Sequence, residues 1–143
     1  MKTKFAVLTI LFPTLCGGGT LSKPLDIRAL IAYEATRAGL EPAVAIAIAK
    51  VESNFNPRAV GSLGEIGLFQ VRPEFASVSR KELFRPRINI QEGVRMLLFA
   101  RKYCPHNLDM TYVTCYNSGI HRKPKYPHKL KYYRKFREAY NVQ

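Results

Sequence analysis

Apolar residues recur at helical spacing from residue 27 onwards. Ile27, Ile31 and Ala35 follow one another at intervals of four, which places them on one face of a helix. Asp26 is a favourable N-cap residue before this run, and Gly39 is a natural stop after it. The pattern predicts a first helix over residues 26–38.

The next segment is apolar on all sides. Pro42 is typical of a first helical position, and residues 43–49 contain no polar side chain. A helix without a polar face is expected in the middle of a domain. Ser53, Asn54, Asn56 and Pro57 end it, so Glu52 should lie in the last turn of a buried helix.

Residues 54–72 are rich in residues that favour turns. Gly61, Gly64, Gly67 and the pair Asn56-Pro57 predict loops or a small irregular β-hairpin. Short helices are expected after Pro73 and over residues 80–84.

Helical patterns return in the second half of the chain. Asn89, with Glu92 three residues later, resembles a capping box, and the helix it would start continues to about Tyr103. Two further helices are expected over residues 109–117 and 128–140. The fold class is therefore mainly α, with a small irregular β or loop element beside the buried helix.

The N-terminal stretch has the layout of a secretory signal peptide. Lys2 and Lys4 precede a short apolar run, Phe5 to Phe12, and small residues from Cys16 follow. We expect a leader over residues 1–19, a single domain over 20–143, and export to the periplasm or cell wall. The run is too short for a lasting membrane span.

Two other interpretations of this stretch stay open. It could be a buried N-terminal helix, or Cys16 could carry a lipid anchor. Leu15 is bulky where a lipid-attachment signal has a small residue, which disfavours the anchor.

The charge balance is strongly basic, with 23 Lys and Arg residues against 10 Asp and Glu and a formal net charge of +13. Such a chain favours polyanions: nucleic acid, anionic membrane or an acidic cell wall. Export makes the wall the best of these, and we expect no nucleic-acid partner. The basic C-terminal segment also carries a packing face of Leu130, Tyr133, Phe136 and Tyr140.

Cys104 and Cys115 belong to the expected mature domain. They are either a disulfide or two buried thiols, because spacing alone cannot fix the separation of their Cα atoms. No His and Cys residues have zinc-ligand spacing, so we expect neither a metal nor an organic cofactor.

Four sequence elements, taken together, resemble a known family. They are Ala47 to Pro57 around Glu52-Ser53, Gly64 to Gln70, Asn89-Ile90 with Gly93, and Tyr116 to Gly119. In this order and at these separations they are similar to the catalytic signature of the lytic transglycosylases related to the soluble lytic murein transglycosylases. The resemblance spans residues 42–119, and four ordered elements are far more specific than a lone Glu-Ser.

The resemblance implies an α-rich lysozyme-like fold and cleavage of peptidoglycan. The bond cut would be the β-1,4 link between N-acetylmuramic acid and N-acetylglucosamine, with a 1,6-anhydro product. Glu52 would be the single catalytic acid and base, with the substrate's C6 hydroxyl as nucleophile and its N-acetyl group assisting. Burial and the negative end of the helix dipole should both raise the pKa of Glu52, as an acid catalyst needs.

The other candidate site residues follow from the same elements. Gln70 would bind sugar or be a satisfied buried amide, and Tyr116 would orient Glu52, touch sugar or be a core aromatic. Asn117 is expected to brace the backbone near the substrate. Ser62 and Phe69 complete the expected substrate-binding set together with Glu65.

The sequence departs from the family pattern at three of these places. Glu65 stands where a small residue is common, Phe69 where Met is common, and Gly61 near a usual Ser that the adjacent Ser62 could replace. Glu65 beside Glu52 could hold a water, which would favour a hydrolytic muramidase of the goose-type lysozyme class. Otherwise Glu65 is an exposed acid or part of a loop salt bridge.

Two further expectations concern partners. The chain would act as a monomer on glycan strands, in the service of a secretion system or another assembly that crosses the wall. A catalytically silent wall-binding assembly protein is the remaining alternative.

Overall fold

The computed structural model describes residues 25–104, 110, 112–118 and 131–142. The expected leader over residues 1–19, with Cys16, lies outside the described residues. The same holds for Asp109, at the start of the helix predicted over residues 109–117, and for residues 119–130. None of the helices in the described ranges combines the length and the apolar character that crossing a membrane requires.

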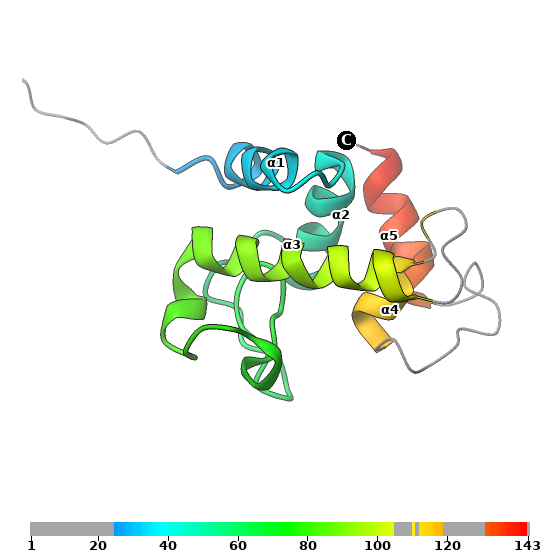
Figure 1. The fold of residues 1–143 in the computed structure, drawn as a ribbon. Coiled ribbons are helices and arrows are strands. Elements are labelled where there is room, and N and C mark those ends of the chain that lie inside the picture. The colour runs from blue at the N-terminus through cyan, green and yellow to red at the C-terminus, as the bar shows by residue number, and fades with distance from the viewer. Residues whose placement is uncertain (1–24, 105–109, 111, 119–130, 143) are drawn as a thin grey trace, which may run out of the picture.

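The first two helices lie where the sequence predicts them. Helix α1 (Ile27–Arg37) starts after Asp26, whose side chain accepts a hydrogen bond from the Ala29 backbone N–H. Helix α2 (Pro42–Ser53) begins with its proline and buries Val44, Ala45, Ala47, Ile48 and Ala49. It contacts α1 and α5, so the predicted central helix is confirmed (Figure 1).

The segment between α2 and α3 forms a lobe without regular strands. Isolated antiparallel bridges join Val60 to Ile66 and Ile66 to Val71, which is the irregular β element expected from the glycines. Two 3-10 turns follow, η1 (Pro73–Phe75) and η2 (Glu82–Phe84). In Figure 1 this green lobe extends away from α1 and α2 on the other side of α3.

Helix α3 (Pro86–Tyr103) starts earlier than the sequence predicts. The prediction of Asn89 as its N-cap is wrong, because Pro86 occupies the first turn and Asn89 is already helical. The Asn89 side chain instead bonds outside its own helix. It accepts from the Phe69 N–H at 2.9 Å and donates to the carbonyls of Ile66 at 2.8 Å and Leu83 at 2.9 Å. Asn89 therefore fixes the lobe to α3.

Two short helices complete the described chain. Helix α4 (Tyr112–Ser118) contacts α3, and α5 (Lys131–Asn141) contacts both α2 and α4. A disulfide joins Cys104, at the end of α3, to Cys115 in α4, with the Cα atoms 6.3 Å apart. On α5, Phe136 is fully buried and Tyr133 nearly so, which confirms the predicted packing face at these two positions.

Candidate active site

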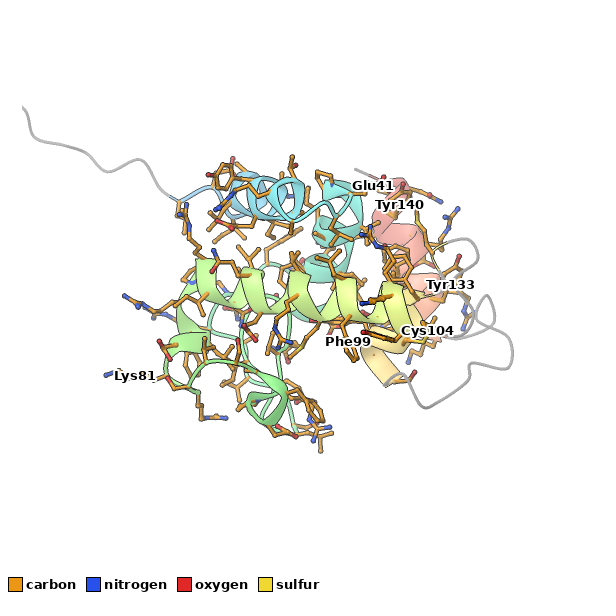
Figure 2. All side chains as sticks on the ribbon, in the orientation of Figure 1. Glu41, Lys81, Phe99, Cys104, Tyr133 and Tyr140 are labelled. Atoms are coloured by element: carbon orange, nitrogen blue, oxygen red, sulfur yellow. A yellow bond between two sulfur atoms is a disulfide. The ribbon has the colours of Figure 1, made fainter. Side chains whose placement is uncertain are left out.

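A large cavity lies where the end of α2, the lobe, α3 and α4 meet. Its volume is about 820 Å³. From α3, the side chain of Phe99 lines it, near the α4 end of that helix (Figure 2). The residues that line it include most of the predicted site: Glu52, Ser62, Glu65, Gln70, Tyr116 and Asn117.

Glu52 reaches this cavity from the last turn of α2. The helix ends at Asn54, which has a left-handed backbone, so the chain turns sharply just after the carboxylate. Ser53 Oγ donates to the Leu68 carbonyl at 2.9 Å and holds the helix end against the lobe. The sequence pattern therefore predicts the position of Glu52 correctly.

Among the described residues, Tyr132 is the hydrogen-bond partner of the Glu52 carboxyl group. Tyr132 Oη, from α5, donates a hydrogen bond of 2.6 Å to Glu52 Oε1. Burial raises the pKa of Glu52 from 4.5 to about 7, the Tyr132 hydrogen bond opposes this shift, and the negative charge of Glu65 adds to it. Near neutral pH the group can therefore both hold and release a proton, which suits acid and base catalysis.

Tyr116 lines the same cavity from α4. Its hydroxyl donates to the Phe69 carbonyl at 2.6 Å, which ties α4 to the lobe. Burial, together with the charge of Glu52, raises the pKa of Tyr116 well above its ordinary value, so the phenol stays protonated. In this structure Tyr116 fixes the cavity wall and does not donate to the carboxylate.

Gln70 sits in a constrained turn at the cavity wall. Its backbone has a positive φ of 45°, a conformation that non-glycine residues rarely adopt, and its Nε2 donates to the Gly67 carbonyl at 3.0 Å. The turn directs the amide to the cavity. Backbone strain of this kind is commonly kept at functional sites.

The structure does not bring the side chain of Phe69 to the cavity. This corrects the expectation that Phe69 binds substrate. The ring is fully buried and lies against Gly93, where a Cβ atom would overlap it. Only the backbone of Phe69 serves the site, through its hydrogen bonds with Tyr116 and Asn89.

Several residues of the site are missing from the sequence prediction. Tyr132 is the most important, because α5 places it against α2 although 80 residues separate it from Glu52. Phe75 and Phe99 line the cavity while 62% and 49% exposed. Arg72 and Arg95 also line it and pair with Glu74 and Glu92. An aromatic residue shortly after the Gly64 to Gln70 element is the one signal in the sequence that could have indicated Phe75.

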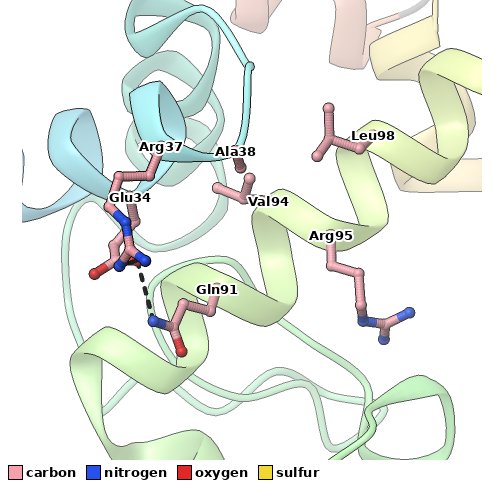
Figure 3. A pocket seen from close by; sticks show the side chains of 7 residues that line it. All are labelled: Glu34, Arg37, Ala38, Gln91, Val94, Arg95 and Leu98. Carbon is pink, nitrogen blue, oxygen red and sulfur yellow. Dashed lines mark hydrogen bonds and ion pairs between the residues drawn. The ribbon is translucent and has the colours of Figure 1, made fainter.

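A smaller cavity, of about 310 Å³, lies between α1 and α3, and polar residues of the two helices contact each other there. Figure 3 shows Gln91 donating to the buried carboxylate of Glu34, at 3.0 Å. Arg87 and Arg37 also pair with Glu34, at 3.3 and 3.8 Å. The charge of Glu34 is thus compensated, and the cluster joins α1 to α3. In the described part of the chain, no group of three or more His, Cys, Asp or Glu side chains is arranged to hold a metal ion.

The chain is similar in sequence to proteins of one known family. The family model described as the transglycosylase SLT domain matches residues 29–139. The membrane-bound lytic murein transglycosylase C of Histophilus somni strain 2336 is 34% identical over 108 residues, which cover 63% of this chain and 30% of that protein. The protein of the same name from Actinobacillus pleuropneumoniae serotype 5b is 33% identical over the same coverage. The chain thus spans under a third of the length of these relatives.

Solved structures show the same fold. An inactive mutant of the lytic transglycosylase Slt from Pseudomonas aeruginosa aligns with a TM-score of 0.62 and 21% identity, over 82% of this chain and 22% of that one. The 70 kDa soluble lytic transglycosylase of Escherichia coli aligns with a TM-score of 0.59 and 22% identity, over 79% and 18% of the two chains. The expectation of a mainly helical fold of this type is confirmed.

Proposed function

The chain belongs to the transglycosylase SLT domain family, and on this premise we propose that it is a lytic transglycosylase that cleaves the glycan strands of peptidoglycan. The proposed bond is the β-1,4 link between N-acetylmuramic acid and N-acetylglucosamine. The observation that carries the proposal is the carboxyl group of Glu52. It lies at a large cavity, with a pKa raised to about 7 and a tyrosine hydroxyl on one oxygen.

In the proposed reaction Glu52 acts twice. Its protonated carboxyl gives a proton to the glycosidic oxygen while the bond from that oxygen to C1 breaks. The C6 hydroxyl of the same sugar then bonds to C1 and returns its proton to the Glu52 carboxylate. One carboxyl group is sufficient because the nucleophile is already tethered to the reacting carbon.

Tyr132 and burial favour opposite states of this carboxyl group. As a donor Tyr132 stabilises the carboxylate that forms after the first proton transfer, and it fixes the orientation of Oε1. Burial has the opposite effect, because it favours the neutral acid needed at the start. The balance keeps the pKa near the pH at which proton donation and proton uptake are both rapid.

Substrate binding is proposed for the groups that share the cavity with Glu52. Gln70 and Asn117 offer amide groups, Ser62 a hydroxyl, and Glu65 a carboxylate. Amides and hydroxyls of this kind can bond the hydroxyl and acetamido groups of the two sugars.

Export to the cell envelope and service to an assembly that crosses the wall are also part of the proposal. The leader pattern and the net charge of +13 support them.

Product analysis tests the function directly. Purified peptidoglycan is digested with wild type and with Glu52→Gln, and the fragments are weighed by mass spectrometry. Wild type should release anhydro ends, each lighter by one water than a reducing end, and Glu52→Gln should release none. Reducing ends from wild type would indicate the hydrolytic muramidase, and equal release by both proteins would refute the role of Glu52.

A further inference from the structure

Glu65 and Gly61 face each other across a tight turn at the edge of the large cavity. The Gly61 N–H donates to the Glu65 carbonyl at 2.8 Å, and both residues line the cavity with Glu52. A Cβ atom at position 61 would overlap Glu65 Oε2 and lie 2.7 Å from Gln70 Oε1. The absence of a side chain at Gly61 therefore creates the space that the Glu65 carboxylate and the Gln70 amide occupy.

The carboxylate is also held in place from its own turn. The Leu63 N–H donates to Glu65 Oε2 at 3.0 Å, so this oxygen has a fixed position. The charge of Glu65 also acts on Glu52. Burial is the main cause of the raised pKa of Glu52, and the negative charge of Glu65 raises that pKa further. A charge that acts on Glu52 across this cavity also acts on a sugar carbon bound beside Glu52.

Glu65 differs from the other charged residues of the cavity wall. The guanidinium groups of Arg72 and Arg95 pair with Glu74 and Glu92, so their charges are largely compensated where they stand. Glu65 takes part in no ion pair with any of the described residues. It thus places a fixed negative charge at the site, although the chain as a whole carries +13.

We propose that Glu65 is a further substrate-facing residue, whose carboxylate, seated over Gly61, stabilises the positive charge that develops on the sugar ring as the glycosidic bond breaks. This inference rests on the proposed function. The transition state for breaking such a bond resembles an oxocarbenium ion. A preoriented charge that faces it lowers the barrier without any rearrangement during the reaction. Glu65 forms no bond to the sugar and exchanges no proton.

The variant Glu65→Gln separates this role from a structural one. A glutamine still accepts the Leu63 N–H, so the turn is kept and only the charge is lost. On solubilised peptidoglycan we expect kcat to fall about tenfold while KM changes less than about twofold. The basic limb of the pH profile should move to lower pH, because a charge that raises the pKa of Glu52 is removed. Glu138→Gln, at an exposed position on α5, is the matched control.

The variant Gly61→Ala tests whether the missing side chain at position 61 gives the Glu65 carboxylate its position. The new methyl group should displace Glu65 and lower kcat by a similar factor. In a Glu65→Ala background the same substitution should have less effect on kcat, because only the contact with Gln70 Oε1 then remains. This is a double-mutant cycle, and the coupling between the two positions is the measured quantity. If circular dichroism shows that Gly61→Ala does not fold, the result for Glu65→Gln alone tests the inference.

Two results would overturn the inference. The first is a Glu65→Gln enzyme with unchanged kcat, which would leave Glu65 a purely structural turn residue. The second is a fall in kcat in Glu65→Gln without a shift of the basic limb of the pH profile, which would show that the loss does not come from the removed charge. Failure of the proposed function looks different, since wild type would then release reducing ends, or Glu52→Gln would remain as active as wild type.

Discussion

The hydroxyl of Tyr132 donates a hydrogen bond of 2.6 Å to Oε1 of Glu52, and this contact joins α5 to the end of α2. Among the described residues, it is the one hydrogen bond made to the carboxyl group of the proposed acid. Burial raises the pKa of Tyr132 itself well above its ordinary value, and the charge of Glu52 adds to the shift. The phenol therefore remains a donor at every pH at which Glu52 titrates.

Replacing Tyr132 by Phe should lower activity and shift its pH dependence. The hydrogen bond lowers the pKa of Glu52, so without it that pKa should rise above about 7 and the basic limb of kcat should move to higher pH. We expect kcat to fall about tenfold from the lost stabilisation of the carboxylate. Initial rates between pH 5 and pH 9, about the range in which the group titrates, measure both effects.

Tyr33→Phe is the matched control for this variant, because Tyr33 is 53% exposed on α1 and does not line the large cavity. Tyr132→Phe and Glu65→Gln should shift the basic limb in opposite directions, since the tyrosine lowers and Glu65 raises the pKa of Glu52. A common direction for both variants would contradict the assigned causes.

Glu52 should make the stability of the protein depend on pH. Its pKa is about 7 in the folded protein against an ordinary value of 4.5, so the unfolded chain loses this proton first as the pH rises. The favourable contribution is complete below pH 4.5 and is lost as the pH rises through about 7. At about 1.4 kcal/mol per pKa unit the loss is at most about 3 kcal/mol, because water screens the partly exposed side chain.

The variant Glu52→Gln does not titrate and so lacks this loss. Relative to wild type it should be more stable at pH 8 than at pH 4, as measured by urea denaturation at the two values. Equal differences at both pH values would show that the carboxyl group is not held in a buried setting.

The disulfide should contribute to stability and to the site together. Closing a loop of this length stabilises a protein by about 3 kcal/mol, mainly through the unfolded chain. We expect the double variant Cys104→Ser, Cys115→Ser to lose about that much free energy of unfolding in guanidinium. Activity should fall too, because Cys115 precedes Tyr116 and both line the cavity. Cys16→Ser should leave both quantities unchanged.

Phe75 should contribute to substrate affinity through its exposed ring. A ring that is 62% exposed at the cavity can cover the apolar face of a sugar. Covering part of it is worth about 1 kcal/mol, so Phe75→Ala should raise KM roughly fivefold with a smaller change in kcat. Phe84→Ala, at an exposed ring that does not line the cavity, is the control. A change confined to kcat would contradict a binding role.

Asn89 should tolerate no acidic replacement. An aspartate offers no donor to the carbonyls of Ile66 and Leu83 and would bury a charge beside them. Leaving two buried acceptors without partners costs at least about 3 kcal/mol, which thermal unfolding would show. The control is Asn56→Asp, because Asn56 is exposed and only accepts, from the Arg58 N–H at 2.9 Å. Similar losses from both variants would contradict the role of Asn89.

The parts of the fold that depend on local sequence could be predicted. The Asp26 cap, the proline at the start of α2 and the apolar run behind it fix two helices and the place of Glu52. Glycine positions similarly indicate the irregular lobe. Local signals suffice here because capping and burial of one helix involve neighbouring residues.

The parts that depend on distant packing could not be predicted. Asn89 has the sequence context of a cap, yet helix α3 already starts at Pro86 and the Asn89 side chain bonds the lobe. Tyr132 belongs to a basic and aromatic segment in which no residue type marks the one that reaches Glu52. The bridge of Cys104 with Cys115 stayed open for the same reason, since spacing does not determine the distance between the two helices.

The docking of α5 also sets an order of assembly during synthesis. A nascent chain that extends only to Asn117 already contains Glu52, Glu65, Gln70 and Tyr116 but not the hydroxyl that holds the carboxylate. In such an intermediate Glu52 has no hydrogen bond from Tyr132, and α2 lacks its contacts with α5. The competent arrangement therefore arises only after α5 has been translated and has packed against α2.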